Sequence, residues 1–456
     1  IFFVISGYLI TRLILKQIDE GVFSLKNFYI KRYRRLVPAL NISIIFSLIL
    51  FICFYFPYDL NDFKESLIYT IFFLSNFYFW RSIDYFNPEV ETELLAHTWS
   101  LGIEEQFYIL LPVFLLMLFY FKLNEKIILF FTLALATFSF YLCTSVEFLE
   151  MVTKFYLLPM RFWELAFGVI AALLIRNYEF KKNNFVSLLS FFLLIYSLIY
   201  LDIKLNHPGF GTLIPVFSTF LLIIFNSEDS IISKLFEIKI FQILGLASYS
   251  IYLIHYPLFA INKYWNISEQ IQVSGVLIEI VFLFLSIVLG IFSWRFVETP
   301  YRDENLVSNY KLILHNGVIS LILVAVVSSS VLNDIVYSIN DFEVNFDTAK
   351  ERSSNPCLIT NSEDLLNEIL CLSTYEVGKA NYLLIGESVA NDFYFGLKEN
   401  ISSEETISLL GVTGCVPLVT EYNKENLYFN EKKCVNNYMI VKDVINKYDF
   451  EKIIIF

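Results

Sequence analysis

Long apolar stretches recur along residues 1–332, and short segments rich in charge separate them. A helix that crosses the hydrocarbon core of a membrane needs about 20 mostly apolar residues. Backbone groups in lipid must be hydrogen-bonded within the protein, so such stretches fold as helices. The sequence therefore predicts an all-α polytopic membrane bundle, with spans at residues 1–15 (a partial span), 38–56, 101–121, 127–143, 156–175, 185–201, 210–225, 240–261, 273–296 and 313–332.

The composition fits a chain that faces lipid. Hydrophobic residues make up 57% of it and charged residues 17%, whereas a soluble domain carries about 25% charge. The first residues, IFFVISGYLI, lack the charged start and the cleavage site of a signal peptide. We expect them to belong to a bundle whose first helix lies upstream. We also expect the strand-like ending, EKIIIF, to be cut from a longer domain.

The distribution of Lys and Arg predicts the side on which each loop lies. With the loop at residues 16–35 in the cytoplasm, the inside loops carry 16 Lys and Arg and the outside loops carry five. This is the bias that the positive-inside rule describes. Counting the short apolar stretch 67–80, which contains Asn76, as a span would reverse the bias. We therefore predict that this stretch is re-entrant or interfacial, and that the segment from residue 333 lies outside.

The segment from residue 333 is acidic and resembles a soluble domain. It carries 20 Asp and Glu against 10 Lys and Arg, and it has no basic patch of the kind that binds nucleic acid. Strand-like runs (NYLLIG, ETISLLG and EKIIIF) alternate with helix-like runs (ESVANDFYFGLKENI and YMIVKDVINKY). This alternation predicts an α/β domain with a parallel sheet.

The same segment contains an even number of cysteines, as expected of a domain outside the cytoplasm. Four cysteines allow three pairings, of which we favour the nearest-neighbour one, Cys357 with Cys371 and Cys415 with Cys434. No CxxC motif occurs, so we expect no metal site.

Six segments of the membrane part resemble the acyltransferase-3 family of membrane O-acyltransferases, and they occur in the family's order. They are FFVISGYLIT, FYIKRYRRLVPAL, HTWSLGIEEQFYILLP, RFWELAFG, LGLASYSIYLIHYPL and WRFVETPYR. The acidic segment, with LLIGES, TGC and its cysteines, resembles the SGNH domain often fused behind such membrane domains. The resemblance implies a membrane domain at 1–302, a linker and last transmembrane helix at 303–332, and an SGNH-like domain at 333–456. It also implies about ten spans plus one linking span.

The resemblance further implies a reaction and its partners. Family members transfer an acyl group, usually acetyl from acetyl-CoA, across a bacterial inner membrane to a surface glycan such as lipopolysaccharide O-antigen. The expected partners are therefore acyl-CoA, a glycan acceptor and the lipid bilayer. Two other classes stay open. One is a transporter, although no internal repeat with paired broken helices is evident. The other is a membrane-anchored glycan-binding protein with an inactive tail.

A basic cluster stands at the cytoplasmic start of the span at 38–56. Lys31, Arg32, Arg34 and Arg35 could serve only as a positive-inside anchor. Alternatively they clamp the phosphates of acyl-CoA, since guanidinium groups bind phosphate through two parallel hydrogen bonds. The family's Arg motif falls on this segment, and on that resemblance we predict that Arg32 and Arg35 bind the donor.

Two further sets of charged residues lie in or beside predicted spans. Glu104 and Glu105 follow His97 and Trp99 near the outer start of the span at 101–121. They either begin a solvated helix or orient a catalytic group or the acceptor hydroxyl. Within the next set, Arg161 and Glu164 share a helix face. They form a structural ion pair or line a path for the acyl donor.

The histidines contribute less to the sequence-based prediction. His255 stands in an apolar helix and is more typical of a packed core residue, while His207 and His315 look like loop and membrane-edge residues. The family's membrane catalytic histidine lies on its first helix, which we expect upstream of Ile1.

In the acidic segment, Ser388 follows a strand and opens a helix. It is either a nucleophile or an ordinary N-cap. The family's turn reads G-D-S-H, and Glu387 and Val389 depart from it here. Gly414 is the predicted donor of an oxyanion-hole N–H. The resemblance places the family's remaining Asn and Asp-x-x-His after Phe456.

Overall fold

The computed structural model of the protein describes residues 1–82, 90–121, 123–146, 150–200, 207–267, 273–339, 372–373, 380–386, 394, 397, 402, 404–411, 445 and 450–455. The chain divides into two compact units, Ile1–Phe342 and Glu343–Phe456. The boundary predicted between residues 332 and 333 falls inside a helix of the first unit.

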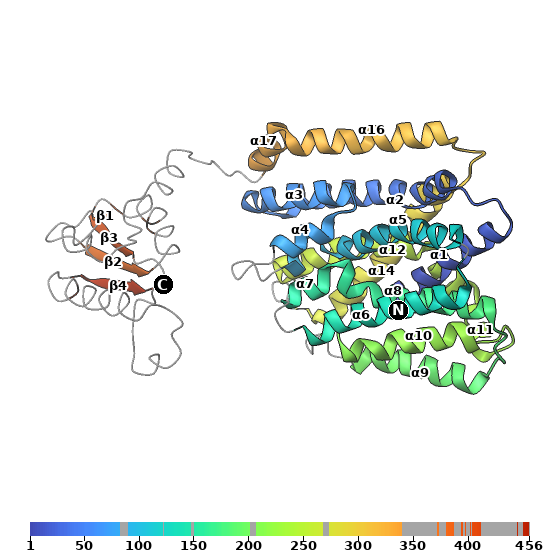
Figure 1. Ribbon diagram of the computed structural model, residues 1–456. Coiled ribbons are helices and arrows are strands. Elements are labelled where there is room, and N and C mark those ends of the chain that lie inside the picture. Colours follow the sequence, from blue (N-terminus) through green and yellow to red (C-terminus); the bar gives the residue numbers. More distant parts are fainter. Residues whose placement is uncertain are drawn as a thin grey trace. The chain divides into compact units, whose positions relative to one another are not determined.

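The first unit is helical in its described residues (Figure 1). Its α-helices are α1 (Phe2–Asp19), α2 (Leu25–Phe54), α3 (Leu60–Ile71), α4 (Ser75–Ser82), α5 (Trp99–Tyr120), α6 (Glu125–Ser145), α7 (Met151–Tyr156), α8 (Leu158–Asn177), α9 (Asn184–Tyr200), α10 (Leu213–Phe225), α11 (Ile231–Phe236), α12 (Lys239–Trp265), α14 (Gly275–Ser293), α15 (Thr299–Arg302), α16 (Asn309–Ser328) and α17 (Ser330–Ile339). Short 3-10 turns η1 (Pro57–Asp59), η2 (Val90–Thr92), η3 (Ala96–Thr98) and η4 (Phe210–Thr212) and a π-helical turn η5 (Trp294–Glu298) complete it.

Within the described ranges, seven helical stretches are long and apolar enough to cross a membrane. They are Leu25–Phe54, Ala96–Tyr120, Glu125–Ser145, Met151–Asn177, Lys239–Trp265, Gly275–Arg302 and Asn309–Ser328. Seven is fewer than the ten predicted. The other three predicted spans form helices that fall short: α9 and α10 have 17 and 13 residues, and α1 includes Arg12, Lys16 and Asp19. The multi-pass helical architecture is confirmed.

The stretch predicted to be re-entrant or interfacial, 67–80, is broken into two short helices. α3 ends at Ile71, and α4 begins at Ser75. Between them Phe73 adopts a positive φ of 57°, which ends the first helix in a sharp turn. The buried amide of Asn76 donates to the carbonyl oxygen of Tyr156 at 3.1 Å and accepts from Gln106 at 2.8 Å. This side chain therefore joins α4 to α5 and α7.

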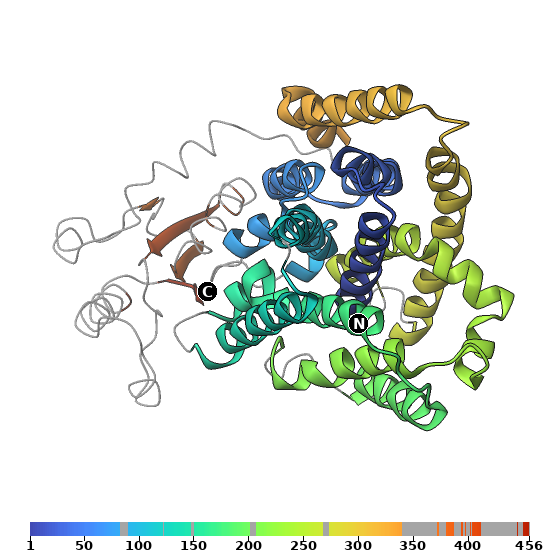
Figure 2. The same ribbon diagram turned by 45° about the vertical axis from the view of Figure 1, so that its right-hand side comes forward.

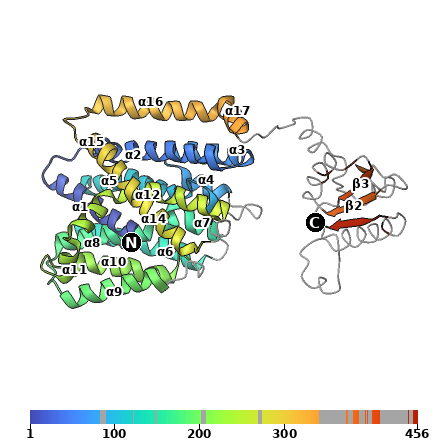
Figure 3. The same ribbon diagram turned by 180° about the vertical axis from the view of Figure 1, so that it is seen from behind.

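Figures 1 and 3, seen from opposite sides, show α16 beside α2 along one edge of the bundle and α9 beside α10 along the other. Figure 2 shows α5 between the blue helices α1 and α2 and the green helices of the opposite side. Glu104 of this helix is buried.

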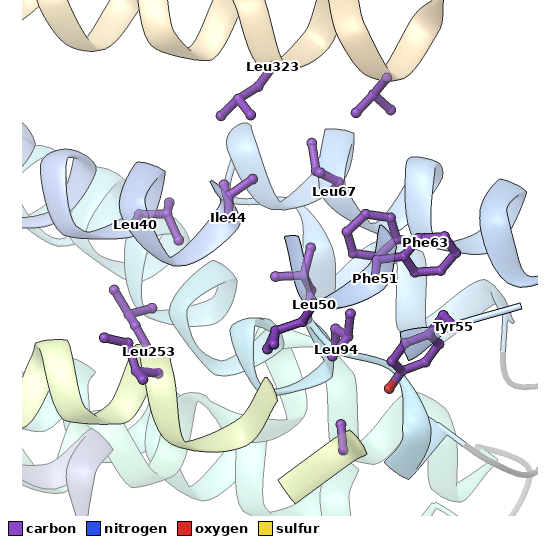
Figure 4. Close-up of a cluster of buried hydrophobic side chains, with 14 of the residues drawn as sticks. Leu40, Ile44, Leu50, Phe51, Tyr55, Phe63, Leu67, Leu94, Leu253 and Leu323 are labelled. Carbon is purple, nitrogen blue, oxygen red and sulfur yellow. The ribbon is translucent and has the colours of Figure 1, made fainter. Parts of the chain in front are cut away.

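A large apolar core fixes α2 against its neighbours (Figure 4). Leu40, Ile44 and Phe51 of α2 pack with Phe63 of α3 and Leu253 of α12, and the Phe51 and Phe63 rings stack with centroids 4.4 Å apart. Lipid tails are as apolar as these side chains, so close packing rather than transfer out of water stabilises the contact. This packing sets the rotation of α2, and with it the directions of the basic residues near the helix start.

The second unit contains a four-stranded sheet in the order β1-β3-β2-β4. Its strands are β1 (Leu372–Ser373), β2 (Ala380–Gly386), β3 (Glu405–Gly411) and β4 (Lys452–Ile455). β2 pairs in parallel with both β3 and β4, as predicted, but the unpredicted strand β1 pairs antiparallel with β3. The predicted helix-like runs 387–401 and 438–448 lie almost entirely outside the described residues.

Candidate functional site

The basic cluster at the start of α2 is divided among three environments. α2 begins after Ser24, whose hydroxyl caps the helix by accepting from the backbone N–H of Asn27. Successive residues of a helix point about 100° apart, so the four cations cannot face one target. Arg32 points into the bundle, Arg34 is buried under the loop after α15, and Lys31 and Arg35 are exposed.

Arg32 forms a largely buried ion pair with Glu105 of α5, with side chains 11% and 16% exposed. Its Nη2 donates to Oε1 at 2.8 Å and its Nε donates to the same oxygen at 3.2 Å. The guanidinium also lies 3.5 Å from the centre of the Tyr108 ring, a cation–π contact. A charged group inside a span is costly unless it is paired. The ion pair therefore explains how both Arg32 and Glu105 can lie inside the bundle.

Glu104 extends this polar network to α1. Its Oε1 accepts from the Ser6 hydroxyl at 2.8 Å, and its Oε2 accepts from the Tyr108 hydroxyl at 3.3 Å. Glu104 is 8% exposed, so it is not part of a solvated helix start. The two predicted carboxylates therefore lie inside the bundle with Arg32, in a network that joins α1, α2 and α5.

An open pocket of about 450 Å³ lies at the end of the bundle predicted to be cytoplasmic, lined by Lys31, Arg34, Arg35, Gly245, Leu246, Arg302 and Glu304. Arg34 donates to the carbonyl oxygens of Tyr301 and Val307, both at 2.7 Å, and to the side chain of Asn309 at 2.6 Å. It therefore ties the loop that follows α15 to α2.

Arg302 is also bonded, because its Nη2 lies 2.7 Å from the carboxylate of Glu298. Neither Lys31 nor Arg35 forms a hydrogen bond or ion pair with the described residues, and both are exposed at the pocket. These two cations are therefore available to an anionic ligand.

The π-helical turn η5 positions Glu298. The carboxylate is fully buried and accepts from the Ser250 hydroxyl of α12 at 2.7 Å. Single π turns inside α-helices are rare and often occur at functional sites. Through Arg302, this turn sets one wall of the basic pocket.

Arg161 occupies a separate site at the end of α8 predicted to be outside. Its Nε lies 2.9 Å from Glu164, and its guanidinium carbon lies 5.4 Å from the ring centres of Phe3, Trp99 and Phe155. Arg161 is 4% exposed. Three aromatic rings therefore surround the Arg161 guanidinium near the start of α8. Arg176 lies at the other end of the same helix.

His207, which the sequence suggested was a simple loop residue, contacts this site. Arg161 can only donate, so Nε2 of His207 accepts from it at 3.3 Å. The ring proton then sits on Nδ1 and faces the Thr212 hydroxyl at 2.8 Å. Burial, with Arg161 beside it, lowers the pKa of His207 to about 4, so the ring is neutral at physiological pH. Nothing in the sequence around His207 predicts this contact, since Arg161 lies on α8, far away in the chain.

Two more histidines meet in the half of the bundle that the sequence predicts to be outer. The rings of His97 in η3 and His255 in α12 lie 5.8 Å apart, and Tyr256 stacks on His97 at 5.1 Å. Tyr252 donates to the backbone carbonyl oxygen of His97 at 2.5 Å. His255 therefore faces a second imidazole rather than an apolar core alone.

The remaining predicted site residues belong to the second unit. Ser388 and Gly414, with Glu387 and Val389, lie outside the described residues, as do all four cysteines of that segment. Their roles and the disulfide pairing stay predictions. β2 ends at Gly386, directly before Glu387 in the sequence, and Gly386 is in register with Gly411 of β3.

A helical bundle with seven candidate spans and ion pairs sealed inside it defines a multi-pass membrane protein. The family profile described as an acyltransferase domain matches residues 1–334, and the chain belongs to this family. The match ends before the described strands of the second unit begin, so the SGNH assignment stays a prediction.

Curated relatives carry O-acetyltransferase names. A putative O-acetyltransferase of Staphylococcus aureus (strain COL) is 30% identical over 324 residues, which cover 67% of this chain and 52% of that protein. The peptidoglycan O-acetyltransferase OatA of Listeria monocytogenes is 28% identical over 68% of this chain and 52% of its own length. The O-acetyltransferase OatA of S. aureus (strain NCTC 8325 / PS 47) is 31% identical over 66% and 52%. The chain spans about half the length of these relatives. No solved structure matches it.

Proposed function

We propose that this protein transfers an acyl group, in the first instance acetyl, from cytoplasmic acyl-CoA to hydroxyl groups of a cell-surface glycan. Membership of the acyltransferase family supports acyl transfer, and the names of the relatives support acetyl. Peptidoglycan is the acceptor that one relative's name carries, and lipopolysaccharide O-antigen is the other acceptor we consider. The protein would work in a bacterial plasma membrane, with residues from 333 onward outside.

The donor proposal rests on the difference between bonded and unbonded cations in the basic pocket. Arg34 and Arg302 are bonded within the protein, which leaves Lys31 and Arg35 exposed beside them. Coenzyme A is rich in phosphate, and charge-assisted hydrogen bonds from Arg and Lys recognise phosphate. We therefore propose that Lys31 and Arg35 bind the donor phosphates.

The other residues predicted to bind the donor take different roles in this proposal. Arg32 is paired with Glu105 inside the bundle, so it would stabilise the path of the acyl group rather than bind phosphate. Arg161 lies at the opposite end of the bundle from the pocket in the predicted topology, so we assign it to the acceptor side. Glu104 and Glu105 would order the bundle interior between these two ends.

The second unit would receive the acyl group outside. Ser388 and Gly414 follow β2 and β3, which are parallel neighbours ending in register at Gly386 and Gly411. Loops after the carboxyl ends of adjacent parallel strands share one edge of a sheet, where sites commonly form. This supports a role for Ser388 as an acyl carrier and for Gly414 as an oxyanion donor.

The test measures thiol release from acetyl-CoA in membranes that contain the full-length protein, beside acetyl content of the cell's glycan by NMR. We expect Arg35→Ala to raise the KM for acetyl-CoA about tenfold or more, since a hydrogen bond between charged groups contributes about 1.5–3 kcal/mol. Lys26→Ala is the matched control, because Lys26 is an exposed cation of the same helix that does not line the pocket. An unchanged KM in Arg35→Ala would mean that the basic cluster only anchors the topology and does not bind the donor.

Separate peptidoglycan and O-antigen fractions identify the acceptor. If protein-dependent acetyl groups occur in only one of the two fractions, that glycan is the acceptor. Absence of protein-dependent acetyl in both, with no thiol release, would favour a transporter or a glycan-binding protein.

A further inference from the structure

The basic pocket contains a carboxylate as well as cations. Glu304 lines it together with Lys31 and Arg35, and all three side chains are exposed. Within the part of the chain that the structure describes, the Glu304 carboxylate forms no hydrogen bond and no ion pair, although four cations line the same pocket. A carboxylate weakens the binding of a simple anion, because like charges repel. Its presence therefore indicates a ligand that carries hydrogen-bond donors as well as negative charge.

The segment that carries Glu304 is held in place on both sides. Arg34 donates to the carbonyl oxygens of Tyr301 and Val307, which flank the segment. Between these points the backbone N–H of Val307 donates to the carbonyl oxygen of Asp303 at 3.0 Å. The turn is thus ordered without a ligand, and an ordered turn places a binding group at a small cost in entropy.

Another part of the pocket wall is apolar. It consists of Gly245 and Leu246 of α12, and Leu246 is 54% exposed. Packing does not require the glycine, since a Cβ on Gly245 would meet nothing within 4 Å. A glycine lets a ligand approach the backbone closely. Bare backbone beside an exposed leucine is therefore a surface against which a flat, uncharged ring can lie.

The size and the chemistry of the pocket fit one class of ligand. Its volume of about 450 Å³ lies within the range of small-molecule sites, roughly 300–1,000 Å³. A nucleotide combines phosphates, a ribose with hydroxyl groups and a flat base. Coenzyme A has a nucleotide at one end and the thiol that carries the acyl group at the other. The cations, the carboxylate and the apolar wall together match the nucleotide end.

We propose that Glu304 is a specificity-determining residue that recognises the nucleotide end of the acyl donor. Its carboxylate accepts a hydrogen bond from a ribose hydroxyl or from the amino group of the base. Lys31 and Arg35 bind the phosphates, and the base lies against Gly245 and Leu246. This inference rests on the proposed acyl-transfer function and its donor site. It gives Glu304 a role in choosing the donor and none in the chemical step.

The test compares acetyl-CoA with S-acetyl-4′-phosphopantetheine, which keeps the thioester and a phosphate but lacks the nucleotide. The KM for each donor is measured by thiol release in membranes that contain the full-length protein. We expect Glu304→Ala to raise the KM for acetyl-CoA about tenfold, the effect of losing one hydrogen bond to a charged group. The KM for the shorter donor and the kcat for both should stay within about twofold. Glu304→Gln keeps an acceptor oxygen, so it should lose less.

Glu237→Ala is the matched control. Glu237 is an exposed acid just before α12, and it does not line the pocket. Its KM for acetyl-CoA should match that of wild type. A Glu304→Ala variant whose KM for acetyl-CoA equals the wild-type value would overturn the inference. An equal rise in KM for both donors would overturn it too, because the shorter donor has no nucleotide to lose.

Binding measurements distinguish this inference from the proposed function. Coenzyme A is titrated into the detergent-solubilised, full-length protein by calorimetry, which needs no turnover. If Glu304→Ala weakens this binding about tenfold while wild-type membranes release no thiol, the nucleotide site stands and acyl transfer fails. If thiol is released but Glu304→Ala binds coenzyme A as wild type does, the proposed function stands and this inference fails. No binding of coenzyme A to wild type would overturn both.

A lipid headgroup that joins a phosphate to an amino group offers the same two kinds of group. Short-chain phosphatidylethanolamine is therefore added as a competitor in the calorimetric titration. We expect it to leave the binding of coenzyme A to wild type unchanged. Competition in wild type that disappears in Glu304→Ala would assign the pocket to a headgroup and overturn the nucleotide assignment.

Discussion

Gly7 of α1 lies against Gly168 of α8 so closely that a Cβ on Gly7 would stand 3.3 Å from the Cα of Gly168 and 2.1 Å from the carbonyl oxygen of Leu165. A Cβ on Gly168 would meet the carbonyl oxygen of Val4 at 2.1 Å. Small residues let membrane helices approach backbone to backbone. This crossing brings Ser6 to Glu104 and Phe3 to Arg161.

The first prediction follows from this crossing. Gly7→Ala should destabilise the protein by about 1–3 kcal/mol, because the contact is with backbone atoms that cannot move aside alone. Thermal unfolding in detergent measures the change. Gly317→Ala is the control, since a Cβ there meets nothing within 4 Å, and it should be neutral or slightly stabilising. Equal melting temperatures for the Gly7 variant and wild type would contradict the close crossing.

A second prediction concerns the ion pair of Arg32 and Glu105. Breaking a buried pair leaves one charge unpaired and costs about 3–5 kcal/mol. Arg32→Ala and Glu105→Ala should each destabilise the bundle, and the double variant should lose clearly less than the sum of both. A double-mutant cycle on detergent-solubilised protein measures this coupling. Additive losses would show that the two side chains do not depend on each other.

His207 supports a third prediction, on stability in acid. Burial and Arg161 lower its pKa from 6.5 to about 4, so between these values the unfolded chain binds more protons than the folded one. Stability is therefore full above about pH 6.5 and decreases as the pH falls toward 4. His207→Asn should flatten this slope, whereas His315→Asn should not. Melting temperatures measured from pH 4 to 7.5 test this prediction. If they change with pH in the same way for wild type and His207→Asn, His207 is not the group responsible.

Glu93 supports a fourth prediction with the opposite sign. Burial, with Asp62 and Asp59 nearby, raises its pKa from 4.5 to about 7. The folded state therefore favours the protonated carboxyl, and the contribution of Glu93 to stability is lost as the pH rises from about 4.5 through 7. Glu93→Gln should raise the melting temperature at pH 8 but not at pH 4.5. The exposed Glu150→Gln is the control. A gain that is equal at both pH values would exclude titration of Glu93 as the cause.

A fifth prediction fixes the topology. In a cysteine-free background, Glu20→Cys should react with a membrane-impermeant maleimide only after the membrane is opened, and Asn361→Cys should react in intact spheroplasts. The reason is the excess of Lys and Arg in the loops predicted to be inside. Labelling of both positions from the same side would refute the assignment.

Apolar run length predicted most helices of the first unit, because a helix in lipid must satisfy its own backbone. Seven of the ten predicted spans are long and apolar enough to cross a membrane in the described residues; of the others, α1 carries three charged residues, and α9 and α10 are shorter. In the second unit, β2, β3 and β4 follow the predicted strand-like runs. β1 was not predicted, because a two-residue strand has no pattern to detect.

The candidate site was only partly predictable. The composition of the α2 cluster indicated anion binding, but which of Arg32, Arg34 and Arg35 faces the pocket depends on the rotation of the helix. The core around Phe51 and Phe63 sets that rotation, and no local pattern reveals it. The contacts of His207 with Arg161 and of His97 with His255 join residues far apart in the chain. A sequence without an alignment holds no signal for such pairs.

The π-helical turn η5 also fixes the rotation, about the helix axis, of the residues that follow α14 and form a wall of the pocket. A π turn holds one more residue than the α-helical path it replaces, so deleting one residue there would rotate everything that follows by about 100°. Glu298 and Arg302 would turn together, so Glu298 would leave Ser250 of α12, and the carbonyl oxygen of Tyr301 would leave Arg34. The helix could thus stay intact in lipid while the contacts that hold this wall of the pocket against α2 and α12 were lost. One inserted residue, rather than any particular side chain, keeps the end of the bundle that bears the pocket aligned with the rest.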